Sequence, residues 1–542
     1  MRLKRGMANP PCYMPNQITQ CYHLNTDIEF TVFRIQKGVL YLCMVAGQGI
    51  CIVIRLYRGM SVMTRYEEVA GILRERIEHG IYRVGDRLPS IRAVCQELDV
   101  SISTAQEAYR QLMDVALIES RPKSGYFVLP SRVPSVLPSV SRPAQRPLDI
   151  SQWDQVLELV ATQRDDVRLL LGRGIPNFDY ETLRPLSKIL AGLHRSNDLH
   201  GFNYDKLNGS PELRQQVARL AIASGCLLHP DDIMVTTGCQ EALAIALRTL
   251  TQPGDVVAVD SPSFYGTMQI LKANGLKALE IPTDPQTGIS LEALELALEQ
   301  WPIRAIQVTP TYNNPLGYTM PEARKRALFQ LAQRFDVAII EDDIYGDLSF
   351  SLPRPRTVKS FDDDGRVMLC SGFSKTVGPG LRVGWLAPGR YRDQALHMKY
   401  VSTGASATLP QLAVAEFVAK GHYERHVRYA TRQYQRQRDI MISWIQRYFP
   451  KGAGISYPQG SFLLWVELPA AVDCVKLNQR LAQHAIHVAP GSLFSASGKF
   501  RQCLRLNYAF TLTPSIENAV RTVGELATEM VEEAQTHATS VI

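Results

Sequence analysis

The apolar positions near the start of the chain follow a helical spacing three times and then a strand spacing. Residues 66–79, Leu88–Leu98 and Ser103–Met113 each place apolar side chains on one helical face. The third of these segments opens on Ser-Thr-Ala-Gln, a capping-box pattern. Leu117–Val128 then reads as a strand, a turn and a second strand. Three helices followed by a hairpin predict a small module over residues 64–128.

From residue 151 onward, helical patterns alternate with short runs of valine, isoleucine and alanine. Val256–Val259, Ala305–Val308 and Val337–Ile340 are typical of these runs. Strands that alternate with helices predict an α/β domain with a mostly parallel sheet, here over residues 151–535.

A tract over residues 129–150 separates the two patterns. It carries prolines at positions 130, 134, 138, 143 and 147, with serines between them. We expect such a tract not to pack and to form an extended, semi-rigid tether. It is therefore the clearest predicted domain boundary.

Residues 1–63 predict no domain of their own. The stretch Gly38–Ile54 is largely apolar with basic flanks, but its seventeen residues are at the short limit for a membrane span. It also lies too far from the amino terminus for a usual signal peptide. We favour a start codon at Met60 or Met63, so that the extension is not translated. A membrane anchor is the less favoured alternative.

Composition narrows the class of protein. At 542 residues the chain is too long for one hydrophobic core, and its length predicts about three or four structural units. Its 45% hydrophobic and 20% charged residues are typical of a globular protein. Ten cysteines show no paired spacing and no CxxC, so we expect no disulfide framework, no metal site and a cytoplasmic location.

The net charge of +7 is unevenly distributed along the chain. Residues 64–126 carry nine Lys and Arg against ten Asp and Glu. The predicted three-helix module is therefore not basic overall. Binding of nucleic acid must depend on where particular arginines lie.

Three short sequences in the amino-terminal module carry a family resemblance. Arg-Leu-Pro-Ser-Ile-Arg from residue 87, Val-Ser-Ile-Ser-Thr-Ala from residue 100 and Ser-Gly-Tyr-Phe-Val from residue 124 resemble the GntR family of bacterial regulators. The resemblance implies a winged helix-turn-helix whose third helix enters the major groove of double-stranded operator DNA. Ile102 and Val115 replace residues that are often arginine and glycine in that family, which puts the operator preference in doubt. The implied DNA-binding residues are Arg87, Ser90 and Arg92 around the second helix, Ser101, Ser103 and Thr104 on the third, and Arg121, Lys123 and Gly125 on the wing.

A lysine flanked by small residues is the most informative feature of the long carboxy-terminal part. Lys375 lies in the run Ser371–Trp385, and Arg382 follows it by seven positions. That layout suits an amine that must reach an aldehyde while an arginine holds a nearby phosphate. The run resembles the internal-aldimine segment of fold-type I aminotransferases, which use pyridoxal 5'-phosphate (PLP). The resemblance implies a multidomain chain, with a winged helix-turn-helix followed by a large, mostly parallel sheet domain and a smaller α+β domain.

A PLP site also needs an acid beside the pyridine nitrogen, a partner for the ring oxygen, a stacking ring and a phosphate cradle. Gly238, Cys239 and Gln240 follow a predicted strand and open a helix, whose backbone N–H groups and dipole suit a phosphate. Gly372 replaces a Ser or Thr that often binds phosphate in the family, which lowers the expected cofactor affinity unless Ser371 compensates. The resemblance assigns Lys375, Asp342 and Tyr345 as catalytic, Phe264 to the ring face, Asp342 to the ring nitrogen, Asn314 and Tyr345 to the ring oxygen, Ser374 and Arg382 to the phosphate, Tyr204 to the phosphate across a dimer interface, and Arg505 with Asn314 to the substrate, whose carboxylate the arginine clamps.

A GntR-like head, a proline-rich tether and an aminotransferase-like body together resemble the MocR subfamily of bacterial regulators. The resemblance implies homodimers that bind operator DNA in response to PLP or an amine. We therefore expect a PLP-dependent transcriptional regulator that senses PLP, or an amino acid or amine effector, through an aldimine. A catalytically active aminotransferase is the alternative, because no catalytic residue is visibly lost. A membrane-tethered regulator is a third, poorer interpretation.

Overall fold

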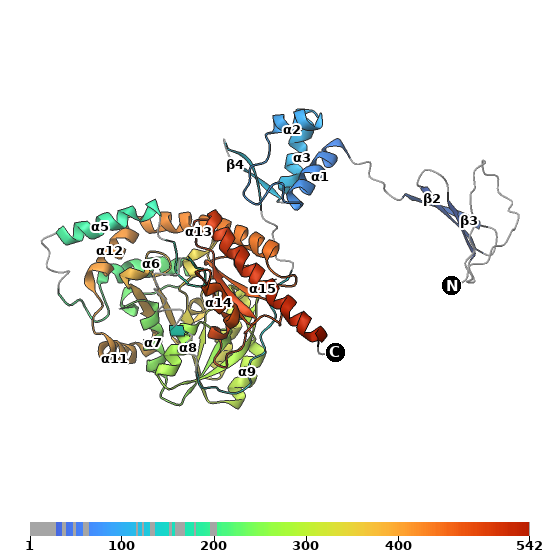
Figure 1. The fold of residues 1–542 in the computed structure, drawn as a ribbon. Coiled ribbons are helices and arrows are strands. Elements are labelled where there is room, and N and C mark those ends of the chain that lie inside the picture. The colour runs from blue at the N-terminus through green and yellow to red at the C-terminus, as the bar shows by residue number, and fades with distance from the viewer. Residues whose placement is uncertain are drawn as a thin grey trace. The chain divides into compact units, whose positions relative to one another are not determined.

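The structure is a computed structural model of the chain, which divides into two compact units, Met1–Val128 and Leu129–Ile542 (Figure 1). Each unit is described by itself. The structure describes residues 29–34, 39–46, 50–57, 64–114, 117–121, 124–129, 136–150, 154, 156–157, 169–177, 180–195 and 203–540.

The first unit begins with a three-stranded antiparallel sheet that the sequence did not predict. Its strands are β1 (Glu29–Arg34), β2 (Val39–Ala46) and β3 (Ile50–Tyr57), paired in the order β1-β2-β3. The apolar stretch considered as a membrane span is divided between β2 and β3 and therefore forms strands rather than a helix. Among the described residues, no helix is long and apolar enough to cross a membrane.

The head, residues 64–128, has the predicted three helices and hairpin. These elements are α1 (Arg65–Glu78), α2 (Ile91–Leu98), α3 (Ile102–Asp114), β4 (Ile118–Arg121) and β5 (Gly125–Val128). Leu73, Val94 and Leu112 are fully buried at its centre. One boundary was predicted wrongly. Ser101, not Ser103, caps α3, because the Ser101 hydroxyl accepts the Thr104 N–H at 3.1 Å.

The body, residues 169–540, is built on an eight-stranded sheet. Its order is β10-β9-β8-β11-β12-β13-β14-β7, and the five strands from β9 to β13 run parallel. The predicted mostly parallel sheet is thus confirmed. The strands are β7 (Met234–Thr236), β8 (Val256–Ser261), β9 (Lys277–Asp284), β10 (Gly288–Ile289), β11 (Ile303–Val308), β12 (Ala338–Asp342), β13 (Val367–Gly372) and β14 (Gly384–Ala387).

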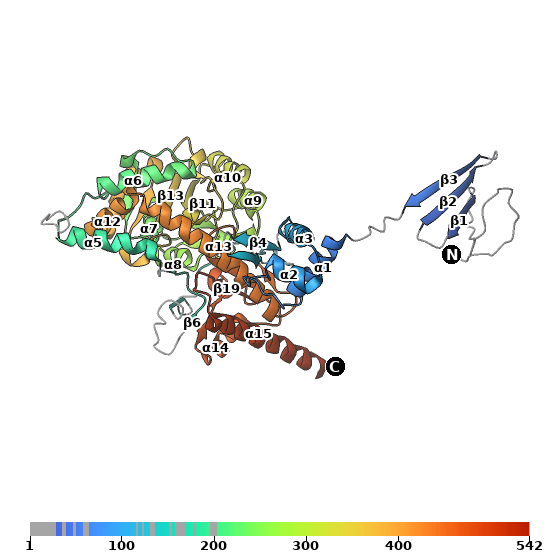
Figure 2. The same cartoon turned by 90° about the horizontal axis from the view of Figure 1, so that it is seen from above.

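Helices cover both faces of this sheet (Figure 2), and α7 packs against β12, β13 and β14. Because the carboxyl ends of the parallel strands lie at one edge, Ser261 and Asp342, which end β8 and β12, face the same side of the body. The helices are α5 (Arg184–Arg195), α6 (Pro211–Ala221), α7 (Cys239–Leu250), α8 (Tyr265–Ala273), α9 (Leu291–Gln300), α10 (Glu322–Arg334), α11 (Arg392–Ser402) and α12 (Thr408–Ala419).

A smaller α+β layer completes the body. Its four-stranded sheet has the order β15-β16-β19-β18, and β6 (Leu169–Leu170) pairs with β17 (Ile486–His487). The remaining elements are α13 (His422–Tyr448), β15 (Gly454–Ile455), β16 (Leu463–Glu467), α14 (Cys474–Ala482), β18 (Ala489–Pro490), the short 3-10 helix η9 (Gly491–Phe494), β19 (Cys503–Asn507) and α15 (Pro514–Ser540).

The expectation that the proline-rich tract does not pack is wrong for its second half, residues 136–150. This interdomain segment lies along the outer edge of β9, where Leu148 and Ala278 exchange two backbone hydrogen bonds of 2.8 and 3.0 Å. Pro138 and Pro143 are buried. A sheet edge offers unpaired backbone groups, and prolines are tolerated beside one, so an extended tract can dock there.

Candidate functional site

The Lys375 amine lies at the carboxyl edge of the large sheet, just after β13. Its Nζ donates a hydrogen bond of 2.7 Å to the Gly174 carbonyl, which belongs to the chain that enters the smaller layer. Burial, followed by the positive charge of Arg505, lowers the pKa of Lys375 to about 8. An amine with that pKa has a useful uncharged fraction at neutral pH and can attack a carbonyl.

Asp342 ends β12 and presents a buried carboxylate to the same edge. Its Oδ1 accepts the Ile344 N–H at 3.1 Å and the Cys239 thiol at 3.5 Å. Burial raises the pKa of Asp342 to about 6, which leaves the group mainly ionised at neutral pH. A buried carboxylate of this kind can hold a proton on a nearby ring nitrogen.

Three segments far apart in the sequence meet around Arg505, a residue of β19. Its Nη1 donates to Asn314 Oδ1 at 2.9 Å, and the Asn314 amide donates to the Tyr345 hydroxyl at 3.5 Å. Its Nη2 donates to the Gly172 carbonyl at 2.6 Å. The Arg505 side chain is fully buried, and among the described residues its Nε has no hydrogen-bond partner. A buried guanidinium with a spare donor suits an anionic ligand.

The amino terminus of α7 and Arg382 form a compact cradle. Gly238 precedes the helix at a φ of +83°, and a Cβ there would lie 2.5 Å from Arg382 Nη2. Arg382 Nη2 donates to the Thr237 carbonyl at 2.8 Å. Ser374, which directly precedes Lys375 in the sequence, is buried. Helix N–H groups beside a guanidinium favour a phosphate.

Gly372 is required by the packing of β13 on β14. A Cβ at this position would lie 2.8 Å from Gly384 Cα. Ser371 does not compensate for the missing hydroxyl, because its Oγ donates to the Asp343 carbonyl at 3.0 Å and the side chain is buried there.

Phe264 caps α8 at the carboxyl end of β8. Its ring centroid lies 4.7 Å from that of Tyr265, whose ring lies 5.5 Å beneath the Arg505 guanidinium. A Cβ on Gly266 would lie 2.3 Å from the Phe264 ring, so that glycine leaves room for the ring. The Phe264 ring is therefore held against Tyr265, whose own ring lies next to Arg505. Tyr204, by contrast, is 96% exposed, and within one chain the structure does not bring it to Lys375.

A buried charge cluster behind Asp342 was missed in the sequence. Asp343 pairs with Arg354 at 2.5 Å, and the same arginine pairs with Asp347 at 2.5 Å. Glu341 accepts the backbone N–H groups of Val358 and Lys359, each at 2.8 Å. The run Glu-Asp-Asp after an apolar strand was the available signal. These contacts fix the strand end that carries Asp342.

The Asn314 turn is held by Asp260, which the sequence analysis also missed. Its carboxylate accepts hydrogen bonds from the Thr309 N–H at 3.1 Å, the Asn313 amide at 3.1 Å and the Tyr318 hydroxyl at 3.0 Å. Burial raises the pKa of Asp260 to about 6. No periodicity marks this acid, because its role depends on a turn that lies 49 or more residues further along.

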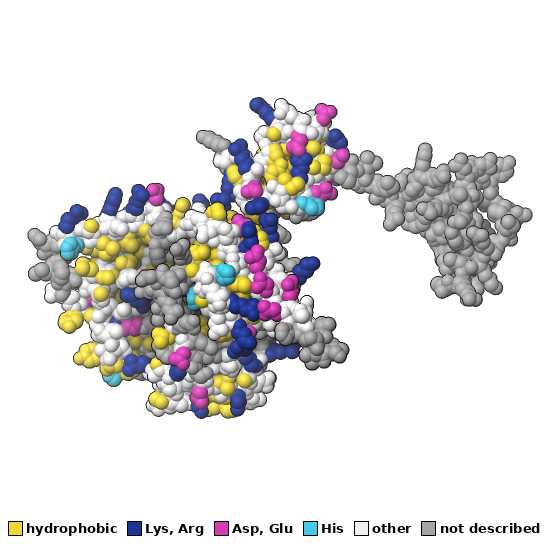
Figure 3. All heavy atoms as spheres, in the orientation of Figure 1, with side chains coloured by type: hydrophobic (Ala, Val, Ile, Leu, Met, Phe, Trp, Pro, Cys, Tyr) yellow, Lys and Arg dark blue, Asp and Glu magenta, His cyan; other side chains and the backbone are white. Residues whose placement is uncertain are grey.

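The head presents a mixed surface of basic and acidic side chains, as its composition indicated (Figure 3). The Ser90 hydroxyl caps α2 by accepting the Ala93 N–H at 3.2 Å, and Arg92 is exposed. Ile102, the first residue of α3, is 55% exposed. Ser103 and Thr104 both bond the Ser101 hydroxyl, at 2.9 and 2.8 Å.

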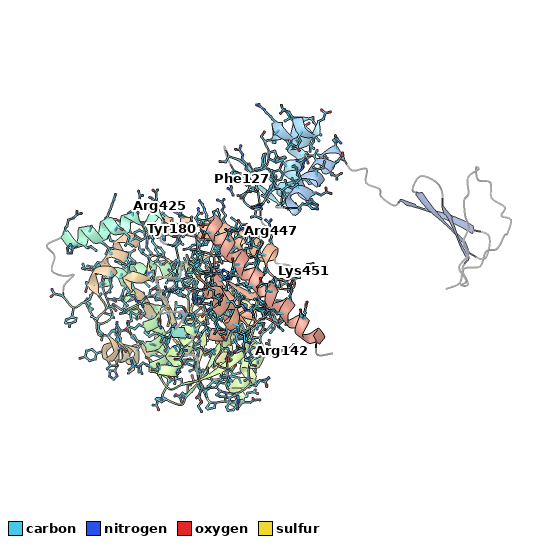
Figure 4. All side chains as sticks on the ribbon, in the orientation of Figure 1. Phe127, Arg142, Tyr180, Arg425, Arg447 and Lys451 are labelled. Atoms are coloured by element: carbon cyan, nitrogen blue, oxygen red, sulfur yellow. The ribbon has the colours of Figure 1, made fainter. Side chains whose placement is uncertain are left out.

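On the wing, some predicted DNA contacts are engaged within the head. Arg121 pairs with Glu119 at 2.7 Å and lies over the Phe127 ring, which Figure 4 labels, at 4.1 Å from its centroid. The Arg87 side chain lies against Gly125, where a Cβ would be 2.9 Å from its Nε. Lys123 and Val115 lie outside the described residues.

Comparisons with known proteins agree with the division into a head and a body. The sequence profile described as "Aminotransferase class I and II" matches residues 168–523, and that described as "Bacterial regulatory proteins, gntR family" matches residues 65–128. The uncharacterized HTH-type transcriptional regulator YjiR of Escherichia coli is 49% identical over 87% of this chain and 100% of the relative. The HTH-type transcriptional regulator TauR of Rhodobacter capsulatus is 28% identical over 81% of this chain and 92% of the relative. Among solved structures, Pyrococcus horikoshii kynurenine aminotransferase in complex with PMP is 28% identical, with a TM-score of 0.64 over 70% of this chain and 94% of that chain.

Proposed function

This chain belongs to the aminotransferase class I and II family and is a GntR-type transcriptional regulator of the MocR architecture, and from that premise we propose that its body binds PLP at Lys375 and reports an amino acid or amine to its DNA-binding head. One observation carries the proposal: Lys375, which follows β13, and Arg505, on β19 of the smaller layer, bond the same short segment at Gly174 and Gly172, beside the strand that ends in Asp342. PLP supplies an aldehyde that captures amines and a ring that withdraws electrons.

The residues at this edge of the sheet fit PLP, apart from the phosphate hydroxyl that Gly372 lacks. The Lys375 amine would supply a nucleophile, and Asp342 would keep a proton at the ring nitrogen. Asn314 and Tyr345, which already touch each other, would hold the ring oxygen, and the cradle of Gly238 and Arg382 would hold the phosphate. The spare Nε of Arg505 points to a further anionic group, the ligand carboxylate.

An incoming amino acid would be drawn to Arg505. Besides its bonds to Asn314 and Gly172, this guanidinium has an unpaired Nε–H and one further N–H on each terminal nitrogen with which it could clamp a carboxylate. Gly174 holds the Lys375 amine from the same chain segment, residues 169–177. A ligand that engages Arg505 and takes the Lys375 amine from Gly174 would therefore act on this segment at two points, which would give the body two distinguishable states.

The DNA side of the proposal rests on α3 and the wing. Residues at the amino-terminal end of α3 would face base edges of double-stranded operator DNA, and Arg92 would contact phosphate. We further propose a homodimer in which the exposed Tyr204 reaches the phosphate site of the partner subunit.

An active aminotransferase remains the second candidate, because Lys375, Asp342 and Arg505 are all present in the sequence. The two functions differ in what an amine does to the bound cofactor. A regulator holds the ligand and stops, whereas an aminotransferase converts the cofactor to its amine form and is restored by a keto acid.

Cofactor absorbance tests the proposal directly. The protein is loaded with PLP and titrated with a panel of amino acids and amines, while operator binding is followed in parallel with the same samples. We expect a stable ligand-bound spectrum and a changed DNA affinity. Turnover that is reversed by a keto acid, with DNA affinity unchanged, would instead establish the enzyme and overturn the sensor.

A further inference from the structure

The docked interdomain segment is joined to β9 by side-chain as well as backbone bonds. The Thr283 N–H donates to the Ser141 hydroxyl at 2.8 Å, and the Ser141 N–H donates to the Thr283 carbonyl at 3.2 Å. Ser141 is 5% exposed and Thr283 is fully buried. This contact is therefore shielded from water. If one of its hydrogen bonds is lost, no bond to solvent replaces it.

The same threonine continues inward to the site. Its Oγ1 accepts the Ser261 N–H at 3.0 Å and donates to the Ile281 carbonyl at 3.0 Å. Ser261 is fully buried at the end of β8, three residues before Phe264. Two hydrogen bonds thus separate a residue of the interdomain segment from the turn that carries the stacking ring.

Glu280 ties that turn to the smaller layer. Its Oε1 accepts the Ser261 hydroxyl at 3.2 Å, and its Oε2 accepts the Ser495 hydroxyl at 3.1 Å. Phe494, which precedes Ser495, lies with its ring centroid 5.0 Å from the Arg505 guanidinium carbon. One buried carboxylate therefore links the ring-stacking side of the site to the carboxylate-binding side.

The interdomain segment touches the second side as well. Lys499, shortly after η9, donates from Nζ to the Arg142 carbonyl at 2.8 Å. Arg142 is labelled on the body in Figure 4. The segment thus bonds to both halves of the network, through Ser141 on β9 and through Arg142 on the loop after η9. A movement of one half against the other must strain or break one of these bonds.

We propose that Ser141 and Thr283 are positioning residues of the cofactor site, and that the interdomain segment is held on β9 more firmly when that site is filled. The inference rests on the proposed function, since it names the path by which the occupied site reaches the chain that leads to the head. Phe264 packs on Tyr265 and Phe494 lies against Arg505, while Thr283 and Glu280 hold Ser261 and Ser495, which precede Phe264 and follow Phe494. Occupation that fixes the two aromatic rings also fixes the groups to which Ser141 and Lys499 are bonded.

Reciprocity makes this coupling measurable from either end. If PLP tightens the docking of the segment by some factor, then undocking the segment must weaken PLP binding by the same factor. One buried hydrogen bond contributes about 1 kcal/mol, which corresponds to about a fivefold change in an equilibrium constant. The expected factor is therefore about 2 to 10.

The experiment compares full-length wild type with Ser141→Ala and Thr283→Val. The matched control is Ser139→Ala, since Ser139 lies in the same segment and only its backbone N–H is used, donating to Glu467 at 2.6 Å. The conservative variant Ser141→Thr keeps the hydroxyl. PLP affinity is measured from cofactor absorbance, and docking from amide hydrogen exchange of peptides covering residues 137–150, with and without PLP.

In wild type and Ser139→Ala, we expect PLP to slow exchange in the segment about 2- to 10-fold. In Ser141→Ala and Thr283→Val, PLP affinity should fall by the same factor, and the effect of PLP on exchange should vanish. Ser141→Thr should restore both. The inference would be overturned, and the proposed function left standing, if PLP affinity were unchanged in both variants or if PLP did not alter hydrogen exchange of the segment in wild type. A wild-type protein that binds no PLP would overturn the proposed function together with it.

Discussion

The rate at which Lys375 captures PLP should rise with pH and then level off above about pH 9. Only the uncharged amine attacks an aldehyde, and burial together with the charge of Arg505 lowers the pKa of this amine to about 8. The reactive fraction is therefore small below neutrality, grows through pH 8, and saturates well before the pH at which an ordinary lysine begins to lose its proton.

The magnitude follows from that pKa. An amine with a pKa of about 8 is roughly 3% uncharged at pH 6.5 and roughly 76% uncharged at pH 8.5, a gain of about 25-fold. A lysine with an ordinary pKa near 10.4 would gain about 100-fold over the same interval and would still be rising at pH 10. The curvature, and not only the slope, distinguishes the two cases.

The assay mixes cofactor-free protein with PLP in a stopped-flow instrument between pH 6 and pH 10 and follows the absorbance of the bound cofactor. Rates are divided by those of Nα-acetyl-lysine with the same PLP, after the latter are corrected for the uncharged fraction of that compound's own ε-amine, which removes the ionisation of the cofactor itself. Arg505→Leu removes a charge that lowers the pKa of Lys375, so the midpoint should move upward. Arg505→Lys keeps the charge and should hold the midpoint. A profile without a plateau in wild type, or a midpoint indifferent to Arg505→Leu, would refute the reasoning.

Further variants test the support around the site and the head. Arg354→Ala leaves the buried Asp343 without its cation, which should lower the free energy of unfolding by about 3–5 kcal/mol in denaturant titrations; a loss under 1 kcal/mol would contradict the assigned pairing. Asp260→Asn keeps the shape but weakens three hydrogen bonds that hold the asparagine turn, so PLP affinity should fall while the melting temperature changes little. Arg92→Ala should weaken DNA binding equally on all sequences and reduce the slope of log K against log salt by about one. Arg110 already pairs with Glu107, so Arg110→Ala should have neither effect. An altered sequence preference in Arg92→Ala would show that Arg92 contacts a base.

The order of chemical groups along the body was predictable because each group follows a recognisable strand or opens a helix. Short spacings in the sequence relate Lys375 to Arg382 and Asp342 to Tyr345, so these two pairs could be predicted without knowledge of the tertiary structure. The meeting of Arg505 with Asn314 was implied only by resemblance, since 191 residues separate them. In the head, the three helices were predicted, while the cap of α3 was displaced by two residues because Ser101 and Ser103 both suit that position.

The interdomain segment shows why the remainder was not predictable. Its prolines and serines indicate an extended chain, and the sequence holds no sign that the edge of β9 is available to receive it. Glu280 had a weak signal, as an acid between the apolar residues Leu279 and Ile281, but its partners Ser261 and Ser495 come from distant segments. Contacts of this kind depend on the assembled fold rather than on local pattern.

The central claim is that the occupied body governs DNA binding, and Lys375→Ala tests it most directly. Operator affinity is measured for wild type and variant, each with and without PLP and with a panel of amino acids and amines. We expect wild type to change its affinity at least about fivefold with an effective ligand. The variant should lack the bound-cofactor absorbance and the ligand response, and it should keep the basal affinity. A folded variant that still responds to the ligand, or one that has lost basal DNA binding altogether, would contradict the account.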